Sequence, residues 1–413
     1  MKKSVLIMSG NFPPFCSAGV FRIVKMVKYL AELGWECHVL PLNYSTKQDQ
    51  SLLHDVPPNA TIHTFKIAVI KPQNRVNIFC KKILGLFQGQ FFPDRYIFKM
   101  LSLLPEGRRI LATQKIDFIF ASSPPYSVLI GGLILSKMTG AKFIVDFRDP
   151  WADNPHLNWG KIKRGCQRFF ESYVVKKADI VIANTDELAD RFRKKYKTAR
   201  IVIINNGYDP DDYKDLITNE EKSSVLTIIH TGKFYPEIRN PHSLLVAVGE
   251  LVATGKVEPG MLKLIFIGGG ELVDEEDFKS LITEYSLSEI VKTRGHLPHQ
   301  EAIAEMAKTD VLLLMQNSPE ASMQIPGKAF EYLFFKKPIL SLSPPGATSN
   351  LIYETDSGLV VNPDDVFAIK EAILHLIALK MDGKLISNFQ YKNIEQYNRK
   401  VQAEQLEKLF FQA

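Results

Sequence analysis

The chain has 413 residues, of which 46% are hydrophobic and 23% are charged, and its formal net charge at pH 7 is +6. These fractions are ordinary for folded globular proteins and exclude a disordered or low-complexity chain. The charge is small for this length, so general nucleic-acid binding is not favoured, and two domains of roughly 200 residues each are expected.

Cysteine spacing and the start of the chain bear on the compartment. The cysteines are Cys16, Cys37, Cys80 and Cys166. Because they show neither C-x-x-C spacing nor a histidine partner pattern, a zinc site and a disulfide framework are not favoured. The first apolar run is interrupted by Ser9, Gly10 and Pro13, so it is too short for a signal peptide. No run reaches the length of a membrane span, about 18 apolar residues. A cytoplasmic protein is therefore expected.

Residues 71–100 form a basic segment, with six basic residues and one acidic residue among apolar and aromatic ones. Such a segment can lie on an anionic membrane surface, which would make the protein peripheral on the inner face of the membrane. It can also be a packed helix whose lysines are solvated. Both interpretations remain open at this point.

Apolar runs rich in β-branched residues alternate with helical patterns along the chain. In the first half they span residues 4–8, 36–42, 117–122, 142–147, 179–185 and 201–207, and in the second half 227–232, 262–269, 310–316, 338–343 and 358–361. This alternation predicts βαβ units with buried parallel strands.

The polar stretch 214–224 interrupts this pattern and predicts a domain boundary. We therefore expect an N-terminal domain over residues 1–215, a second domain over 216–385 and a C-terminal helical tail over 386–413. The predicted fold class is α/β, with two doubly wound parallel-sheet, Rossmann-like domains facing a cleft. Ligands of such sheets bind beyond the carboxyl ends of the strands.

The loop after the first strand, "GNFPPFCSAGVFRIV", lacks the G-x-G-x-x-G pattern of dinucleotide-binding enzymes. A dinucleotide-dependent enzyme that transfers hydride is therefore not favoured. The small "SAG" and the helix that begins near Val20 and carries Arg22 can let a phosphate approach. A plain turn between strand and helix fits this spacing equally well.

Charged residues follow several predicted strands. In "DFRDPW", Asp146, Arg148 and Asp149 stand at the end of an apolar strand, where they either pair with each other or act at the cleft. Lys233 and Arg239 bracket a loop that suits an anionic ligand, although a solvated loop is the alternative. His230 is interpreted as a core histidine. The acidic run 273–277 is interpreted as a helix start, and no metal site is predicted.

The predicted helix "GKAFEYLFFKK" begins at Gly327 and has two unequal faces. At 100° per residue, one stripe is ordinary core and consists of Ala329, Phe330, Leu333 and Phe334. The opposite side carries Lys328 and Glu331, one turn apart, together with Tyr332 and Phe335. Because a solvated face rarely carries two large aromatic rings, we expect a ligand to cover this side.

The sequence resembles glycosyltransferases of the GT-B fold, in the large retaining group called family 4. The resemblance spans nearly the whole chain and rests on segments such as "GNFPPFCSAGVFRIVKMVKYLAELGWECHVL", "DFRDPWADNP", "HTGKFYPEIRNP", "LIFIGGGE" and "IPGKAFEYLFFKKPIL". It implies a nucleotide-sugar donor in the second domain, with UDP as the expected nucleotide. It also implies a carbohydrate or lipid-linked acceptor at the first domain, and neither a cofactor nor a metal.

The resemblance also implies roles for individual residues. Glu331 corresponds to the second glutamate of the family's Glu-x7-Glu pattern and would bind the ribose, whereas Met323 replaces the first glutamate. The "IPGKAFEY" variant is similar to a branch whose lysine, here Lys328, stands beside the phosphates. The implied catalytic residues are Lys328, Arg239, Arg148 and Asp149, and the implied donor-binding residues are Gly19, Gly232, Lys233, Gly295, His296, Lys328 and Glu331.

Two alternatives to sugar transfer remain. A nucleotide-sugar 2-epimerase shares the fold and needs no acceptor. A non-catalytic sugar-nucleotide binding protein is the other alternative, because Met323 departs from the family pattern.

Overall fold

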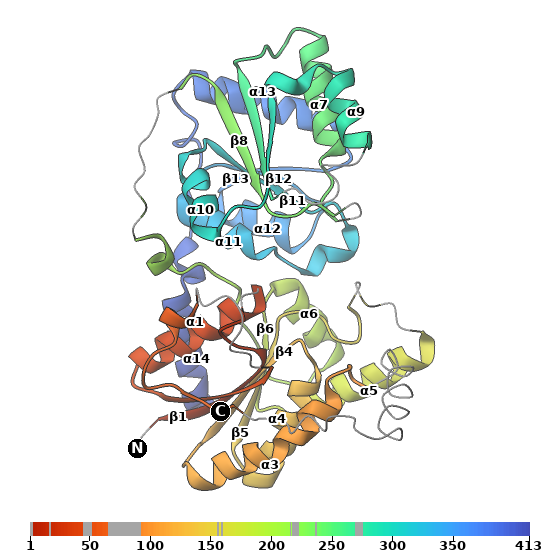
Figure 1. Cartoon of the computed structure of the whole chain (residues 1–413). Coiled ribbons are helices and arrows are strands. Elements are labelled where there is room, and N and C mark those ends of the chain that lie inside the picture. The colour runs from red at the N-terminus through yellow and green to blue at the C-terminus, as the bar shows by residue number, and fades with distance from the viewer. Residues whose placement is uncertain are drawn as a thin grey trace, which may run out of the picture. The chain divides into compact units, whose positions relative to one another are not determined.

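The computed structural model describes residues 3–15, 18–43, 52–64, 92–154, 157, 160–214, 216, 223–235, 238–268 and 276–413. The chain divides into two compact units, each built around one parallel sheet (Figure 1). Unit 1 comprises Met1–Asn206 and Arg399–Ala413, and unit 2 comprises Gly207–Asn398.

The sheet of unit 1 has seven parallel strands in the order β3-β2-β1-β4-β5-β6-β7. The strands are β1 (Ser4–Asn11), β2 (Glu36–Asn43), β3 (Thr61–Ile62), β4 (Phe118–Ser123), β5 (Lys142–Phe147), β6 (Ile180–Ala183) and β7 (Ile201–Ile203). The order reverses direction between β1 and β4, which makes the carboxyl ends of these two strands the switch point where ligands of doubly wound sheets bind.

Helices cover both faces of this sheet because successive residues of its strands point to opposite sides. In β1, Val5 and Ile7 belong to one apolar cluster, and Leu6 and Met8 belong to another. The helices of unit 1 are α1 (Ala18–Glu32), η1 (Leu53–Asp55), α3 (Ile97–Thr113), α4 (Ser127–Thr139), α5 (Lys161–Lys177), α6 (Asp186–Lys195) and α14 (Arg399–Gln412). α1 and α14 contribute to the first cluster, and α3 to α6 contribute to the second.

The sheet of unit 2 has six parallel strands in the order β10-β9-β8-β11-β12-β13. The strands are β8 (Leu226–Thr231), β9 (Leu262–Ile267), β10 (Val291–Arg294), β11 (Val311–Met315), β12 (Ile339–Leu342) and β13 (Gly358–Val361). Here the order reverses between β8 and β11, so the carboxyl end of β8 lies at the switch point.

Helices again lie on both faces of the unit 2 sheet (Figure 1). The longer elements are α7 (His242–Ala253), α9 (Glu276–Glu284), α10 (His299–Lys308), α11 (Gly327–Phe335), α12 (Ala347–Thr355) and α13 (Val366–Met381). The shorter ones are η2 (Pro210–Tyr213), η3 (Leu287–Glu289), η4 (Pro319–Met323) and η5 (Ile394–Tyr397). Residues of α7, α9 and α13 share one apolar cluster with the sheet, and residues of α10, α11 and α12 share the other.

The predicted fold class is confirmed, because both sheets are doubly wound, and every apolar run predicted as a strand contains one. The predictions did not include β3, which has two residues, or β10, in which Lys292, Thr293 and Arg294 are exposed. A strand at the edge of a sheet buries little, so β10 lacks the apolar run by which buried strands are detected.

The two units divide at a different place from the predicted boundary, between Asn206 and Gly207 and not near residue 215. The backbone oxygen of Asn205 accepts a hydrogen bond from Arg22 of α1, whereas the amide of Tyr208 donates to the Tyr397 oxygen of unit 2. The predicted tail 386–413 is also divided: its first residues belong to unit 2 and α14 belongs to unit 1. Phe410 of α14 is buried against Trp35.

The basic segment 71–100 lies outside the described residues up to position 91, and its last residues lead into α3. Among the described residues, none of the helices has the length and apolar character needed to cross a bilayer.

Candidate functional site

The carboxyl end of β8 in unit 2 is closely approached by a lysine. Gly232 follows the strand with φ +119°, a conformation that favours glycine, and a Cβ atom at this position would lie 2.9 Å from Nζ of Lys328. A side chain at position 232 would therefore compete with the ammonium group for space. Glycine at this position therefore leaves room for the lysine side chain beside the loop.

Lys328 stands in the first turn of α11 and reaches back to the strand end. Its Nζ donates a hydrogen bond to the backbone oxygen of Thr231 and lies 3.4 Å from Nε2 of His230. No carboxylate of the described residues is within ion-pair distance of this nitrogen, including that of Glu331 one turn later. The hydrogen-bond acceptors of the ammonium group are thus neutral, and Glu331 acts on its charge only from beyond ion-pair distance.

His230 is completely buried, and its hydrogen bonds define its tautomer. Nδ1 lies 3.0 Å from the backbone oxygen of Leu313, which can only accept, so Nδ1 carries the hydrogen. Nε2 is then unprotonated and accepts a hydrogen bond from Lys328. Burial lowers the pKa of His230 well below its usual value, and the neighbouring Lys328 lowers it further. The interpretation as a buried histidine is confirmed, and this histidine also contacts a candidate site residue.

Arg239 is the second cation of this site. Its Nε atom is buried and has no hydrogen-bond partner among the described residues, and its guanidinium lies 5.8 Å from the centre of the Tyr235 ring. Burial lowers the pKa of Arg239. Burial also lowers the pKa of Lys328 well below its usual value, and repulsion from Arg239 adds to this effect. Two neighbouring cations in a partly desolvated position favour an anionic ligand.

One part of the prediction for α11 was wrong, because on the side of Lys328 protein covers the Tyr332 ring and contacts the Phe335 ring. Tyr332 is completely buried, with its hydroxyl 3.4 Å from the Leu313 oxygen, and the Phe335 ring lies 5.4 Å from that of Tyr213 in η2. The helical wheel separated the faces correctly for Ala329, Phe330 and Leu333, which are buried. A helical wheel cannot show that the sheet and η2 also contact the side of α11 that carries Lys328. On this side of the helix, the two charged residues Lys328 and Glu331 are half-buried.

The remaining donor-site predictions fall on the glycine loops around this strand end. A Cβ atom on Gly268, after β9, would lie 3.3 Å from the Gly232 backbone, and the Gly268 amide donates to the Gly295 oxygen at 3.2 Å. Gly295 is thus linked to Gly232 through Gly268. His296 and Lys233 are exposed, and no contact of either with Lys328 is observed.

Unit 1 has an open pocket beside the carboxyl ends of β1, β2 and β4. Its lining consists of Ser9, Gly10, Asn11, Gly19, Val20, Ile23, Asn43, Tyr96, Pro124, Pro125 and Arg148. Gly19 and Arg148, both predicted site residues, are neighbours here, since a Cβ atom on Gly19 would lie 1.9 Å from Nη1 of Arg148. Arg148 donates through Nε and Nη2 to the backbone oxygens of Ser123 and Pro124.

The buried carboxylate in "DFRDPW" does not pair within its own motif. Asp146 is completely buried and accepts two hydrogen bonds from Arg22, at 3.1 and 2.7 Å, and one from Ser122 at 2.6 Å. The alternative in which the charges of this motif pair with each other is therefore wrong for Asp146. Asp149 is half-buried beside Arg148. The sequence placed Arg22 on a helix whose start can approach a phosphate, but it did not predict this pairing, because the partners are 124 residues apart.

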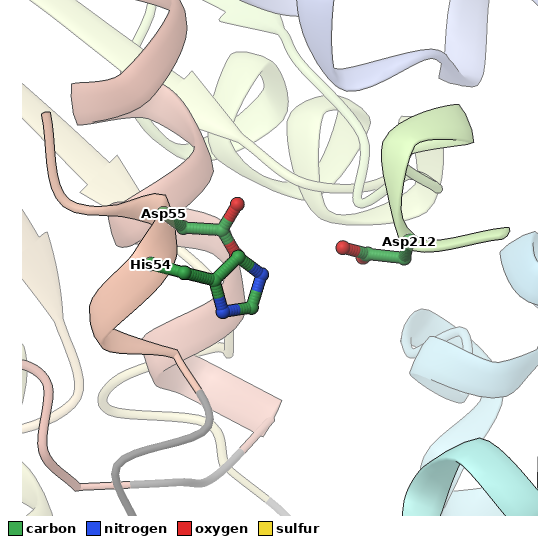
Figure 2. A group of neighbouring side chains, drawn as sticks. All are labelled: His54, Asp55 and Asp212. Atoms are coloured by element: carbon green, nitrogen blue, oxygen red, sulfur yellow. The ribbon is translucent and has the colours of Figure 1, made fainter. Parts of the chain in front are cut away.

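Figure 2 labels three residues whose side chains could each ligate a metal, namely His54 and Asp55 on η1 and Asp212 on η2. The first two belong to unit 1 and the third belongs to unit 2. Within unit 1, Lys25 and Lys28 lie 2.7 and 3.3 Å from the carboxylate oxygens of Asp55. Two ammonium groups already balance this carboxylate, so its role is to hold η1 against α1.

Comparison with known proteins identifies the class to which the chain belongs. Residues 20–212 match the family described as Glycosyltransferase Family 4, and residues 225–378 match Glycosyl transferases group 1. The chain is a GT-B glycosyltransferase. It belongs to the family 4/group 1 type, with one matching domain in each unit. No curated protein sequence matches it.

Solved structures with the same fold cover essentially the whole chain. A glycosyltransferase from Rickettsia africae ESF-5 is 15% identical, with a TM-score of 0.70, and the match covers 100% of this chain and 99% of that one. Anabaena HepE in complex with UDP is 14% identical, with a TM-score of 0.66, and the match covers 99% of this chain and 100% of that one. The lipopolysaccharide outer core galactosyltransferase WaaB is 13% identical, with a TM-score of 0.64 and coverages of 99% and 99%.

Proposed function

We propose that unit 2 binds a nucleoside diphosphate sugar, with UDP as the nucleotide, at the carboxyl end of β8. The observation that carries this proposal is that Lys328 and Arg239 are neighbouring cations beside Gly232, and that neither forms an ion pair with a carboxylate of the described residues. The diphosphate supplies the counter-charge that these cations lack. HepE, a protein of the same fold solved with UDP, supports the choice of nucleotide.

In the proposed reaction, the bond between the sugar and the diphosphate breaks while an acceptor oxygen bonds to the same sugar carbon. Negative charge grows on the leaving diphosphate, and Lys328 and Arg239 stabilise it there. Glu331 binds the ribose hydroxyls and provides position without proton transfer. The departing phosphate takes the acceptor's proton on the face that it leaves, so the sugar retains its configuration. In this scheme the two cations take the place of a divalent metal.

The acceptor is assigned to unit 1, where Arg148 and Asp149 lie at or beside the open pocket. We take it to be a carbohydrate or a lipid-linked intermediate. Residues 71–100 would bring the enzyme to an anionic membrane from the cytoplasmic side. Flotation with anionic and neutral liposomes at low and high salt tests this part, and equal recovery on both kinds of liposome would contradict it.

One experiment separates this function from its alternatives. The purified protein is incubated with radiolabelled uridine, guanosine and adenosine diphosphate sugars and a membrane-lipid or oligosaccharide extract, with and without EDTA. We expect label from the UDP-sugar in the acceptor fraction, with no loss in EDTA. An isomerised donor would identify a 2-epimerase, and binding without turnover would identify a binding protein. Loss of transfer in EDTA, restored by magnesium or manganese, would contradict the metal-free scheme.

A further inference from the structure

The pocket of unit 1 contains a chain of polar contacts that the proposed transfer reaction does not use. Nζ of Lys99, on α3, donates to Oδ1 of Asn43 at 2.6 Å, and Nδ2 of Asn43 donates to Oδ1 of Asn11 at 3.0 Å. Asn43 and Asn11 both line the pocket, at the ends of β2 and β1. The charge of Lys99 is thereby connected to the pocket wall.

The donors and acceptors of this wall are unequally distributed. Because Oδ1 of Asn11 accepts from Asn43, its Nδ2 hydrogens remain to be donated, and Nη1 of Arg148 faces Gly19. The Tyr96 hydroxyl oxygen accepts from Arg95 at 2.7 Å, so its own hydrogen is left for another partner. None of the lining residues is an aspartate or a glutamate. The side chains of Asn11, Tyr96 and Arg148 therefore offer N–H and O–H donors at the pocket.

The charges around the pocket are also unequal. Lys99 is half-buried and makes no ion pair among the described residues, and burial lowers the pKa of its ammonium group. Asp146, the buried carboxylate behind Arg148, is already bonded twice by Arg22. A sugar presents hydroxyls that donate as well as accept, whereas a phosphate group presents only acceptor oxygens and negative charge. The wall fits the second kind of group.

We propose that this pocket recognises a phosphate group on the acceptor, with Lys99, Asn43 and Asn11 as specificity-determining residues. The acceptor is then either a soluble phosphorylated sugar or a lipid-linked phosphate, since both carry the same group. This inference rests on the proposed function only in treating the bound molecule as the acceptor of the transfer reaction. The phosphate site itself belongs to unit 1. Of the residues implied for donor binding, Gly19 lines the pocket, and the others belong to unit 2.

Calorimetry on the full chain, saturated with UDP, tests the proposal with three probes. These are glucose 1-phosphate, neutral methyl glucoside, and a short-chain polyprenyl diphosphate sugar in detergent. The variants are Lys99→Met, which keeps the alkyl chain but removes the charge, Lys99→Arg, and Lys176→Met. Lys176 is an exposed lysine of α5 and serves as the matched control. Melting curves verify that each variant is folded.

We expect at least one phosphorylated probe to bind, and methyl glucoside to bind about tenfold more weakly or not at all. Lys99→Met should weaken that phosphorylated probe about tenfold or more, while Lys99→Arg and Lys176→Met stay within about threefold of the unmodified protein. Binding of glucose 1-phosphate indicates a soluble acceptor, and binding of the polyprenyl probe alone indicates a lipid-linked one. The same affinity in Lys99→Met as in the control, or no binding of either phosphorylated probe, would overturn the proposal.

The UDP titration of the same samples keeps the two proposals apart. If UDP binds equally to all variants but no phosphate probe depends on Lys99, the pocket assignment fails and the donor site stands. If UDP does not bind while a phosphate probe still depends on Lys99, the donor assignment fails and the pocket assignment stands.

Discussion

The ammonium nitrogen of Lys328 lies 3.4 Å from Nε2 of His230, a completely buried histidine at the end of β8. The other ring nitrogen donates to the Leu313 oxygen, so Nε2 presents a lone pair to the lysine. The sheet thus holds the imidazole, and the imidazole helps to hold the cation. We assign His230 as a positioning residue for Lys328.

This assignment predicts a specific kinetic defect. In His230→Asn, the side-chain amide can still donate to Leu313 but no longer reaches Lys328, so kcat should fall about tenfold or more through misplacement of the ammonium group. His230→Gln offers an acceptor at a longer reach and should recover part of the loss. Steady-state kinetics and melting curves of both variants test this. Equal kcat values in the two variants, or a loss that follows only the melting temperature, would mean that His230 has a purely structural role.

The lowered pKa of Lys328 predicts that UDP binding takes up protons. Burial and Arg239 lower the pKa in the free protein, whereas Glu331 raises it. A bound diphosphate raises it again, because it stabilises the charged form. Between these two pKa values the free lysine is neutral and the bound lysine is charged, so affinity falls as the pH rises through that window.

His230 and Tyr332, the titratable neighbours that contact Lys328 or β8, do not contribute to this proton uptake. The pKa of His230 is lowered and that of Tyr332 is raised to about 12 by burial, so both stay neutral across the window. Calorimetry from about pH 7 to about pH 10 in two buffers of different ionisation enthalpy measures the proton uptake. Lys328→Met should remove it. Equal apparent enthalpies in both buffers at every pH would exclude the linkage.

The buried pair of Arg22 and Asp146 in unit 1 predicts that two aspartate-to-asparagine variants differ strongly in their free energy of unfolding. Asp146→Asn leaves the Arg22 guanidinium buried without its counter-charge and should lower the free energy of unfolding by about 3–5 kcal/mol. Asp190 pairs with Arg193 on the surface of α6, 3.0 Å apart. Asp190→Asn should therefore change the free energy of unfolding by only about 0–1 kcal/mol. Denaturant unfolding of both variants makes the comparison. Similar midpoints would show that the buried pair contributes little.

The fold was predictable because buried parallel strands leave continuous apolar runs, such as residues 311–315 of β11. The edge strand β10 left no such run. The position of α14 in unit 1 depends on Phe410 packing against Trp35, and a helical pattern alone does not identify a partner so distant in sequence.

The candidate site was predictable where a single residue carries the chemistry, as Lys328 does. It was not predictable where several segments meet. The sequence gives no sign that Tyr332 is buried against the sheet, since this depends on how α11 packs between strands and η2. The contact between Lys99 and Asn43 has the same origin, because 56 residues separate the two. Side-chain contacts of this range depend on the packed structure.

In the proposed donor site, Lys328 meets the diphosphate while Glu331 meets the ribose. Charge on the diphosphate grows during the reaction, so Lys328→Ala should lower kcat by roughly 10² or more. The ribose does not change, so Glu331→Gln should mainly weaken donor binding, by about 1.5–3 kcal/mol. The exposed Lys256, also in unit 2, provides the control Lys256→Ala.

The most direct measurement is steady-state kinetics of these three variants with varied UDP-sugar, beside their melting curves. We predict a fall in kcat for Lys328→Ala, a rise in KM for Glu331→Gln, unchanged kinetics for Lys256→Ala, and folded protein in every case. Unchanged kcat and KM in a folded Lys328→Ala variant would contradict the assignment of this site.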